Sequence, residues 1–155
     1  MILLLRYSGL RMQDAACLER ARLDEDKLFL YQQKTGTPVY CPLSKPVVQK
    51  LAVLENANQQ SFFYDGKSQP ESMVKSWNRV FKKIGATADP TVPNCHPHRF
   101  RDTFAVSLLL KGVSLDSVSK LLGHSSIKIT ERHYPPWVKA RQEQLESEVR
   151  RIWTS

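Results

Sequence analysis

Apolar residues recur at the spacing of an α-helix along much of the chain. The opening run, residues 1–7, is apolar apart from Arg6 and predicts the last turns of a buried helix, which Ser8 and Gly9 interrupt. The same spacing predicts further helices over residues 11–20, 44–58, 68–86 and 138–153. In the last of these the apolar stripe is sparse, which indicates a helix at the periphery of the fold or one that docks on a partner.

Two short extended runs, residues 28–31 and 38–43, predict a pair of β-strands. The connection between them contains Lys34 and Gly36, and a glycine in a short connection between extended runs indicates a β-hairpin. We therefore expect Lys34 at the tip of a turn, where its side chain can swing toward a ligand.

The residues from 95 to 137 hold the most distinctive pattern, CHPHRFRDTFAVSLLLKGVSLDSVSKLLGHSSIKITERHYPPW. A predicted helix starts at His98 and is ended by Gly112. His98 and Arg101 are three residues apart, so they share one face of this helix and can point at a single oxygen-rich group. Apolar residues then anchor the first turn in the core, and the backbone N–H groups of a helix start also favour an anion.

A second short helix is predicted from Ser114, which can cap it, to Gly123, which stops it and presents His124. Ten residues later Tyr134 stands before two prolines, which cannot continue a helix. Arginine, histidine and a tyrosine held at a helix boundary together suit phosphate chemistry.

Composition agrees with a polyanionic partner. Lys and Arg number 23 against 15 Asp and Glu, a net charge of +8, and such an excess favours nucleic acid through counterion release. The length of 155 residues suits one domain. Cys17, Cys41 and Cys95 form no disulfide framework and predict reduced thiols in a cytosolic chain. The apolar start, residues 1–5, is too short for a signal peptide or a membrane span.

The order His-x-x-Arg, Leu-Gly-His and a tyrosine about ten residues on resembles the catalytic core of the tyrosine recombinases, or phage-type integrases. LGHSSIKITERHYPPW is similar to the C-terminal pattern of that family. The family also has an arginine in a Gly-Leu-Arg segment, matched by Arg11, and a lysine in a β-hairpin turn, matched by Lys34. Asp14 stands where the family commonly has an acid and is expected to brace Arg11. The resemblance implies an α+β fold, mainly helical, with a small antiparallel β-sheet.

Six catalytic residues follow from the resemblance: Arg11, Lys34, His98, Arg101, His124 and Tyr134. Arg11 and Arg101 would clamp the non-bridging oxygens of a DNA phosphate, with a further donor from His124. Tyr134 would attack through its hydroxyl, with His98 as the proton-transfer partner and Lys34 protonating the departing 5′ oxygen. The implied product is a 3′-phosphotyrosyl intermediate, formed without a metal or another cofactor.

Each of these residues also has a plainer interpretation, such as a solvated turn lysine for Lys34 or a core aromatic for Tyr134. All six occur in the required order and in the local structure each needs, which favours the joint interpretation. Arg99 competes with Arg101 for the second arginine role, but the spacing favours Arg101 and leaves Arg99 for the DNA backbone. His96 and His133 fall outside the matched positions and are interpreted as structural or phosphate-contacting residues.

Four other functions compete with strand transfer by a recombinase. A zinc site could draw on Cys95, His96, His98, His124 and His133, but no Cys-x-x-Cys or His-x-x-x-His pair supports it. Residues 114–134 also resemble a helix-turn-helix of a plain DNA-binding module, although the turn carries His124. A type IB topoisomerase relative would share the chemistry. A non-catalytic DNA-binding fragment of a decayed mobile element would keep the fold.

The resemblance implies that residues 1–155 form one catalytic domain. We expect the N-terminal DNA-gripping domain that such proteins usually carry to be missing from this sequence, and the start inside an apolar helix predicts a longer parent protein. The implied partners are double-stranded DNA and further copies of the chain, assembled as a tetramer on synapsed DNA. The helix after Tyr134 would pack on a neighbouring protomer. We expect no membrane partner and a cytoplasmic location at the bacterial nucleoid.

Overall fold

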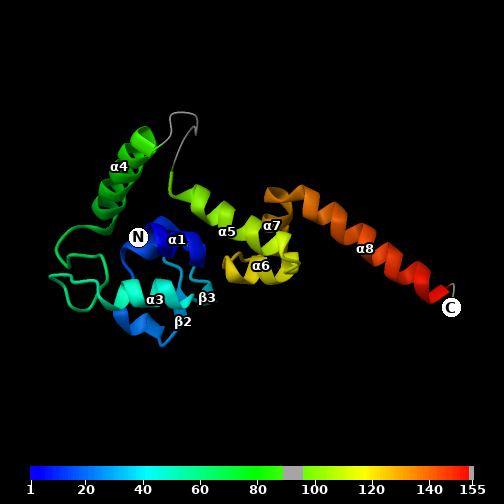
Figure 1. Ribbon diagram of the computed structural model, residues 1–155, viewed down its shortest axis with the longest axis horizontal. Helices are drawn as coiled ribbons and strands as arrows, with labels where there is room; N and C mark the ends of the chain where they lie inside the picture. Colours follow the sequence, from blue (N-terminus) through cyan, green and yellow to red (C-terminus); the bar gives the residue numbers. More distant parts are fainter. Residues whose placement is uncertain (89–95, 154–155) are drawn as a thin grey trace.

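The computed structural model describes residues 1–88 and 96–153. Within these residues the chain forms eight α-helices, a short 3-10 turn and a three-stranded antiparallel sheet. Figure 1 shows the N-terminal helices and the sheet on one side, with α5 leading across to α6 and α7 and α8 running outward to the C terminus. The predicted α+β fold, mainly helical with a small antiparallel sheet, is confirmed.

The first helix, α1 (Ile2–Ser8), lies where the apolar opening run predicts it. Leu4 and Leu5 are buried, whereas Leu3 and Tyr7 are exposed, so the expectation of a buried helix holds for one face only. The chain leaves α1 at Gly9, whose backbone is left-handed with a φ of 64°.

The second helix, α2 (Met12–Ala16), is shorter than the predicted helix over residues 11–20. The backbone after it makes long-range bonds instead: the N–H of Phe62 donates to the carbonyl of Leu18 at 3.0 Å, and Glu19 forms an isolated bridge with Ser61. A 3-10 turn, η1 (Arg20–Arg22), then leads into the sheet.

The sheet consists of β1 (Leu23–Asp24), β2 (Lys27–Tyr31) and β3 (Pro38–Pro42), in that order. Alternate residues of β2 and β3 are buried, so one face of the sheet packs on the core. The turn between β2 and β3 is closed by a 2.9 Å hydrogen bond from the N–H of Gln32 to the carbonyl of Thr37. The predicted hairpin is therefore confirmed.

Helix α3 (Lys45–Ala52) ends six residues before the predicted limit of 58. The reason lies in the loop that follows, where the side-chain amide of Asn56 donates to the carbonyls of Ser61 and Tyr64 at 3.1 and 2.8 Å. Helix α4 (Pro70–Ala88) agrees with the prediction over 68–86 and buries Phe81. Residues 89–95, which follow α4, lie outside the described residues.

The C-terminal part comprises α5 (His98–Leu110), α6 (Leu115–Leu121), α7 (Ile127–His133) and α8 (Pro135–Trp153). Ser114 caps α6 as predicted, with its hydroxyl accepting from the N–H of Ser117 at 3.1 Å. Tyr134 lies at the boundary between α7 and α8. The two prolines after Tyr134 cannot continue α7, but they begin α8. Proline is tolerated in the first turn of a helix because the N–H that it lacks would have no partner inside the helix.

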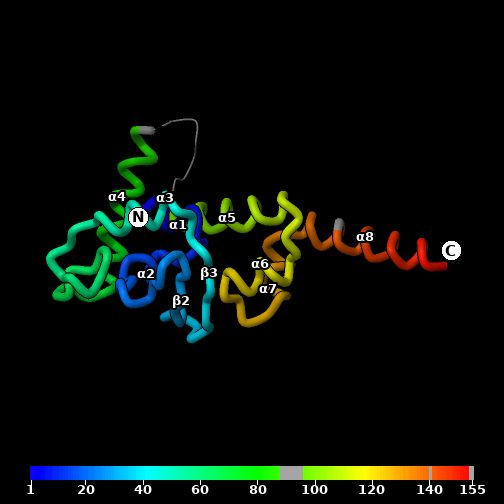
Figure 2. Tube along the Cα trace, turned by 60° about the horizontal axis from the view of Figure 1, so that its bottom comes forward, coloured from blue at the N-terminus to red at the C-terminus, as the bar shows by residue number. Residues whose placement is uncertain are grey.

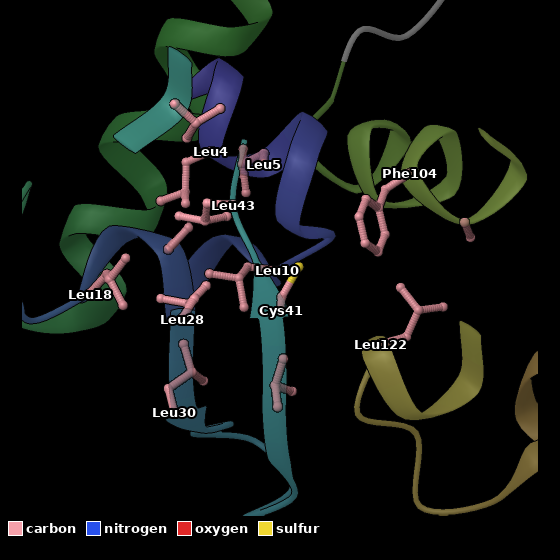
Figure 3. Close-up of a cluster of buried hydrophobic side chains, with 14 of the residues drawn as sticks. Leu4, Leu5, Leu10, Leu18, Leu28, Leu30, Cys41, Leu43, Phe104 and Leu122 are labelled. Atoms are coloured by element: carbon pink, nitrogen blue, oxygen red, sulfur yellow. The ribbon is translucent and has the colours of Figure 1, made fainter. Parts of the chain in front are cut away.

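The core joins the N-terminal part of the chain to helices of the C-terminal part. Figure 3 shows leucines of α1, of the segments on either side of α2 and of the sheet gathered in one cluster, with Phe104 of α5 and Leu122 facing it from the C-terminal part. Figures 1 and 2 both place α6 beside β3, and the two elements are in contact. This packing sets the end of α6 against the β2–β3 turn.

None of the helices within residues 1–88 and 96–153 is long and apolar enough to span a lipid bilayer. Cys17 and Cys41 are free thiols, while Cys95 lies outside the described residues.

Candidate active site

One surface pocket of about 200 Å³ brings together all six residues that the sequence singled out. We call it the arginine pocket; its lining residues are Arg11, Lys34, Thr35, His98, Arg101, Asp102, His124, Ser125, Ile129, His133 and Tyr134. These side chains come from the start of α2, the hairpin turn, the first turn of α5, the loop after α6, and α7 with its C-terminal boundary. The catalytic roles of the six remain a prediction.

Arg101 is the most deeply buried cation of the pocket, with 3% of its surface exposed. Its two terminal nitrogens donate to the carbonyls of Gly9 and Leu122, each at 2.6 Å. Burial, followed by the charge of Arg11, lowers the pKa of Arg101 to about 10. Arg99, the rival for this position, is exposed.

Arg11 occupies the cap position before α2, with extended backbone, and donates a hydrogen bond to Oε1 of Gln32. Burial lowers the pKa of Arg11. Asp14 acts on Arg11 through its charge, which raises the pKa of Arg11 against the effect of burial, and not through a hydrogen bond. Oδ1 of Asp14 accepts from the N–H of Gln33 at 2.9 Å, and Oδ2 has no hydrogen-bond partner among the described residues. Arg11 lies before the helix and not on its face, so the i, i+3 geometry of a helix does not apply to this pair.

Lys34 is exposed on the turn between β2 and β3, as predicted, and lines the arginine pocket. The hydroxyl of its neighbour Thr35 donates to Oε1 of Gln32 at 3.0 Å, and the N–H of Gly36 donates to the carbonyl of Gln32 at 2.8 Å. The two residues that follow Lys34 thus tie the turn back to Gln32, and the lysine itself lines the pocket.

His124 follows Gly123, which ends the turn after α6 with a φ of 61°. Nδ1 of His124 lies 2.7 Å from the hydroxyl oxygen of Thr130 in α7. Burial, then the charges of Arg101 and Arg11, lowers the pKa of His124 to about 4. The imidazole is therefore neutral at pH 7, the form in which one ring nitrogen donates and the other accepts.

Tyr134 is 7% exposed, and its hydroxyl donates to Oδ1 of Asp102 at 3.2 Å. Burial, together with the charge of Asp102, raises the pKa of Tyr134 to about 12. The same carboxylate oxygen lies 4.0 Å from Nε2 of His98. His98 was expected at a core-facing position, but its side chain is 59% exposed, because the first turn of α5 lies at the rim of the pocket. Partial burial of this side chain lowers the pKa of His98.

Three residues that contact the predicted set were not singled out by the sequence: Gln32, Asp102 and Thr130. Asp102 is four residues after His98 and so shares its helical face, a signal that was available. Thr130 and Gln32 had none, because their partners lie on other elements. His133 also lines the pocket, so it stays a candidate for phosphate contact.

No group of three or more His, Cys, Asp or Glu side chains in the described part of the chain is arranged to hold a metal ion. Cys95, one of the ligands considered for zinc, lies outside that part.

The fold is similar to solved recombinase structures. The crystal structure of XerA recombinase matches with a TM-score of 0.68 at 21% identity, covering 83% of this chain and 49% of that one. The Tn1549 transposon integrase, solved in complex with a circular intermediate DNA, matches with a TM-score of 0.66 at 20% identity, covering 92% of this chain and 57% of that one.

The sequence has relatives of the same kind. Tyrosine recombinase XerC of Lactobacillus leichmannii is 25% identical over 132 residues, which is 82% of this chain and 42% of that protein. Tyrosine recombinase XerA of Pyrococcus horikoshii is 26% identical over 158 residues, 94% of this chain and 53% of that protein. The chain thus spans about half the length of the curated relatives it matches. Because residues 1–138 match the phage integrase family, the chain belongs to that family.

Proposed function

We propose that residues 1–155 are the catalytic domain of a site-specific DNA recombinase or integrase, which breaks and rejoins DNA strands through a 3′-phosphotyrosyl intermediate. The observation that carries the proposal is the convergence of two arginines, a lysine and the two histidines His98 and His124 with a tyrosine in one pocket of about 200 Å³. Membership of the phage integrase family supports it.

Arg11 and Arg101 would hold the scissile phosphate. Arg101 has a pKa lowered to about 10, by burial and by Arg11, so an anion between the two guanidinium groups would relieve an existing repulsion. Each terminal nitrogen of a guanidinium carries two hydrogens, so Arg101 can bond a carbonyl and still donate into the pocket. Such donors stabilise the charge that develops on the non-bridging oxygens in the transition state.

His124 would add a neutral donor to the same phosphate. If the hydroxyl of Thr130 donates to Nδ1, the ring proton resides on Nε2, from which it can be donated to a non-bridging oxygen. The pKa of about 4 keeps this tautomer uncharged at neutral pH. Thr130 then acts by fixing which nitrogen faces the phosphate.

Tyr134 would attack the phosphorus as its proton leaves. With a pKa near 12 it holds almost no phenolate at pH 7, so the proton must be transferred while the bond to phosphorus forms. Asp102 accepts a hydrogen bond from this hydroxyl and lies beside His98. Because the pKa of His98 is lowered, its imidazole is neutral and can take the proton. The bond from phosphorus to the 5′ oxygen breaks, and Lys34 protonates that oxygen.

The reaction exchanges one phosphodiester for another, so it requires neither a metal nor a nucleotide cofactor. The partner is double-stranded DNA in the cytoplasm; the net charge of +8 and the solved DNA complex of the Tn1549 integrase support this choice. We further propose assembly of several copies on DNA, up to a tetramer. The exposed apolar residues Leu145 and Trp153 on the outer part of α8 support a contact with a neighbouring copy.

A covalent adduct tests the proposal. The chain and its Tyr134→Phe variant are incubated with a pool of nicked duplexes of randomised sequence, and the products are separated on a denaturing gel. We expect a protein–DNA adduct at a 3′ phosphate from the parent and none from the variant. DNA binding without any adduct from the parent would contradict the proposal and favour a non-catalytic binding fragment. Relaxation of supercoiled plasmid without a partner site would favour a topoisomerase instead.

A further inference from the structure

Gln32 is a buried polar residue at the end of β2, with 1% of its surface exposed, and it does not line the arginine pocket. Both polar atoms of its side chain are nonetheless hydrogen-bonded. Oε1 accepts from Arg11 and from the hydroxyl of Thr35, and Nε2 donates to the carbonyl of Leu122 at 2.8 Å. One amide therefore joins three segments of the chain: the start of α2, the hairpin turn and the end of α6.

The carbonyl of Leu122 is shared with the second arginine. Nη2 of Arg101 donates to it at 2.6 Å, beside the bond from Nε2 of Gln32. Arg11 and Arg101 are thus connected through one amide side chain and one backbone oxygen. This connection fixes the separation of the two guanidinium groups before any ligand is present.

The backbone of Gln32 sets the turn that carries Lys34. Its N–H donates to the carbonyl of Thr37 at 2.9 Å, and its carbonyl accepts from the N–H of Gly36 at 2.8 Å. The turn is closed around Lys34, and the side chain of the same residue anchors it to Arg11. A shift of Gln32 therefore moves the lysine and one arginine together.

We propose that Gln32 is a positioning residue for strand cleavage: it holds Arg11, Arg101 and the Lys34 turn in one geometry. The inference rests on the function proposed above and acts entirely through the residues that line the pocket. The amide group suits this task because it offers an acceptor to a cation and a donor to a carbonyl at the same time. A glutamate would turn a second oxygen toward Leu122, and a methionine would bond neither side.

The test compares Gln32→Glu and Gln32→Met with Gln33→Met, a change at the exposed neighbouring glutamine. Adduct formation is measured in single turnovers, with protein in excess, on the pool of nicked duplexes. A second pool has sulfur in place of the bridging 5′ oxygen, because a thiolate leaves without protonation and so bypasses Lys34. Thermal melting of each variant gives the folded fraction.

We expect both Gln32 variants to lower the single-turnover rate on the oxygen substrate by roughly 10- to 100-fold, the effect of a misplacement near 1 Å, with DNA affinity nearly unchanged. On the sulfur substrate, the part of the rate loss that comes from a misplaced Lys34 should disappear. The part that comes from a misplaced Arg11 should remain. The Gln33→Met rate should equal that of the parent.

A purely structural role for Gln32 would lower the amount of adduct in proportion to the folded fraction, with the rate unchanged on both substrates, and would overturn the inference. Equal rates in the parent and in a folded Gln32→Glu protein would overturn it as well. If Gln32→Met fails to fold, the nearly isosteric Gln32→Glu still decides. Absence of adduct from the parent on both pools would instead refute the proposed function.

Discussion

Replacing Gly123 by alanine tests how the arginine pocket is held together, because this residue lies between Gln32 and His124. A Cβ at Gly123 would lie 2.6 Å from Cγ2 of Val39 and 2.7 Å from Nε2 of Gln32, on a backbone with a φ of 61°. The left-handed conformation costs an alanine about 1–2 kcal/mol. Forcing a methyl group into packed side chains costs about 1–3 kcal/mol more.

Gly112 provides the matched control. Its φ is 82°, but a Cβ there would meet no atom of the described residues within 4 Å, so Gly112→Ala carries the conformational term alone. We expect Gly112→Ala to lose about 1–2 kcal/mol of the free energy of unfolding and Gly123→Ala about 2–5 kcal/mol.

Urea unfolding followed by tryptophan fluorescence measures both losses. In a thermal scan each kcal/mol corresponds to about 2–4 °C for a domain of this size. Adduct formation per folded molecule should fall for Gly123→Ala only, since the added methyl group displaces the Gln32 amide. Equal losses of stability in the two variants would refute the close packing of Gly123 against Gln32.

Three further predictions concern the ionisable groups of the pocket. Asp102→Asn should lower the pKa of Tyr134 from about 12 part of the way to its ordinary value, since a negative charge is removed while burial remains; an unchanged ¹³C NMR titration of the tyrosine ring would contradict this. Between pH 6.5 and about 4 an unfolded histidine binds a proton that folded His124 rejects, so stability falls as the pH falls through this window. His124→Gln should flatten that slope by up to about one proton in unfolding measured at several pH values. Arg101→Ala should lose about 1–3 kcal/mol in urea unfolding by removing donors to two buried carbonyls, whereas Arg99→Ala should change stability by less than about 0.5 kcal/mol.

The sequence predicted those parts of the fold that local chemistry decides. Ser114 starts α6 because its hydroxyl can accept from an N–H three residues on, and the hairpin follows from two extended runs around a glycine. The helix predicted over 11–20 was too long, because Leu18 and Glu19 pair with a segment more than forty residues away. No local sequence pattern predicts such pairing, and in this segment tertiary contacts override helix propensity.

The candidate site divides in the same way. Order and spacing along the chain were enough to choose six residues that the fold brings to one pocket. What holds them there was not predicted, since the partners of Arg101 are backbone carbonyls 92 and 21 residues away. Any residue has a carbonyl, so the identity of Gly9 or Leu122 carries no signal for this contact. Spacing alone placed Asp14 where its charge acts on Arg11, but the hydrogen-bond partner of Arg11, Gln32, was not predicted.

The same guanidinium joins two parts of the fold and lines the pocket in which the proposed phosphate would bind. Arg101 ties the chain after α1 to the end of α6, so its position is fixed by the core rather than by a ligand. Burial beside Arg11 lowers its pKa, which means that the surroundings of Arg101 disfavour its positive charge. In the function proposed above, the negative charge of the phosphate would offset this penalty. Preorganised charge of this kind stabilises a transition state because no reorganisation is required at the moment of reaction.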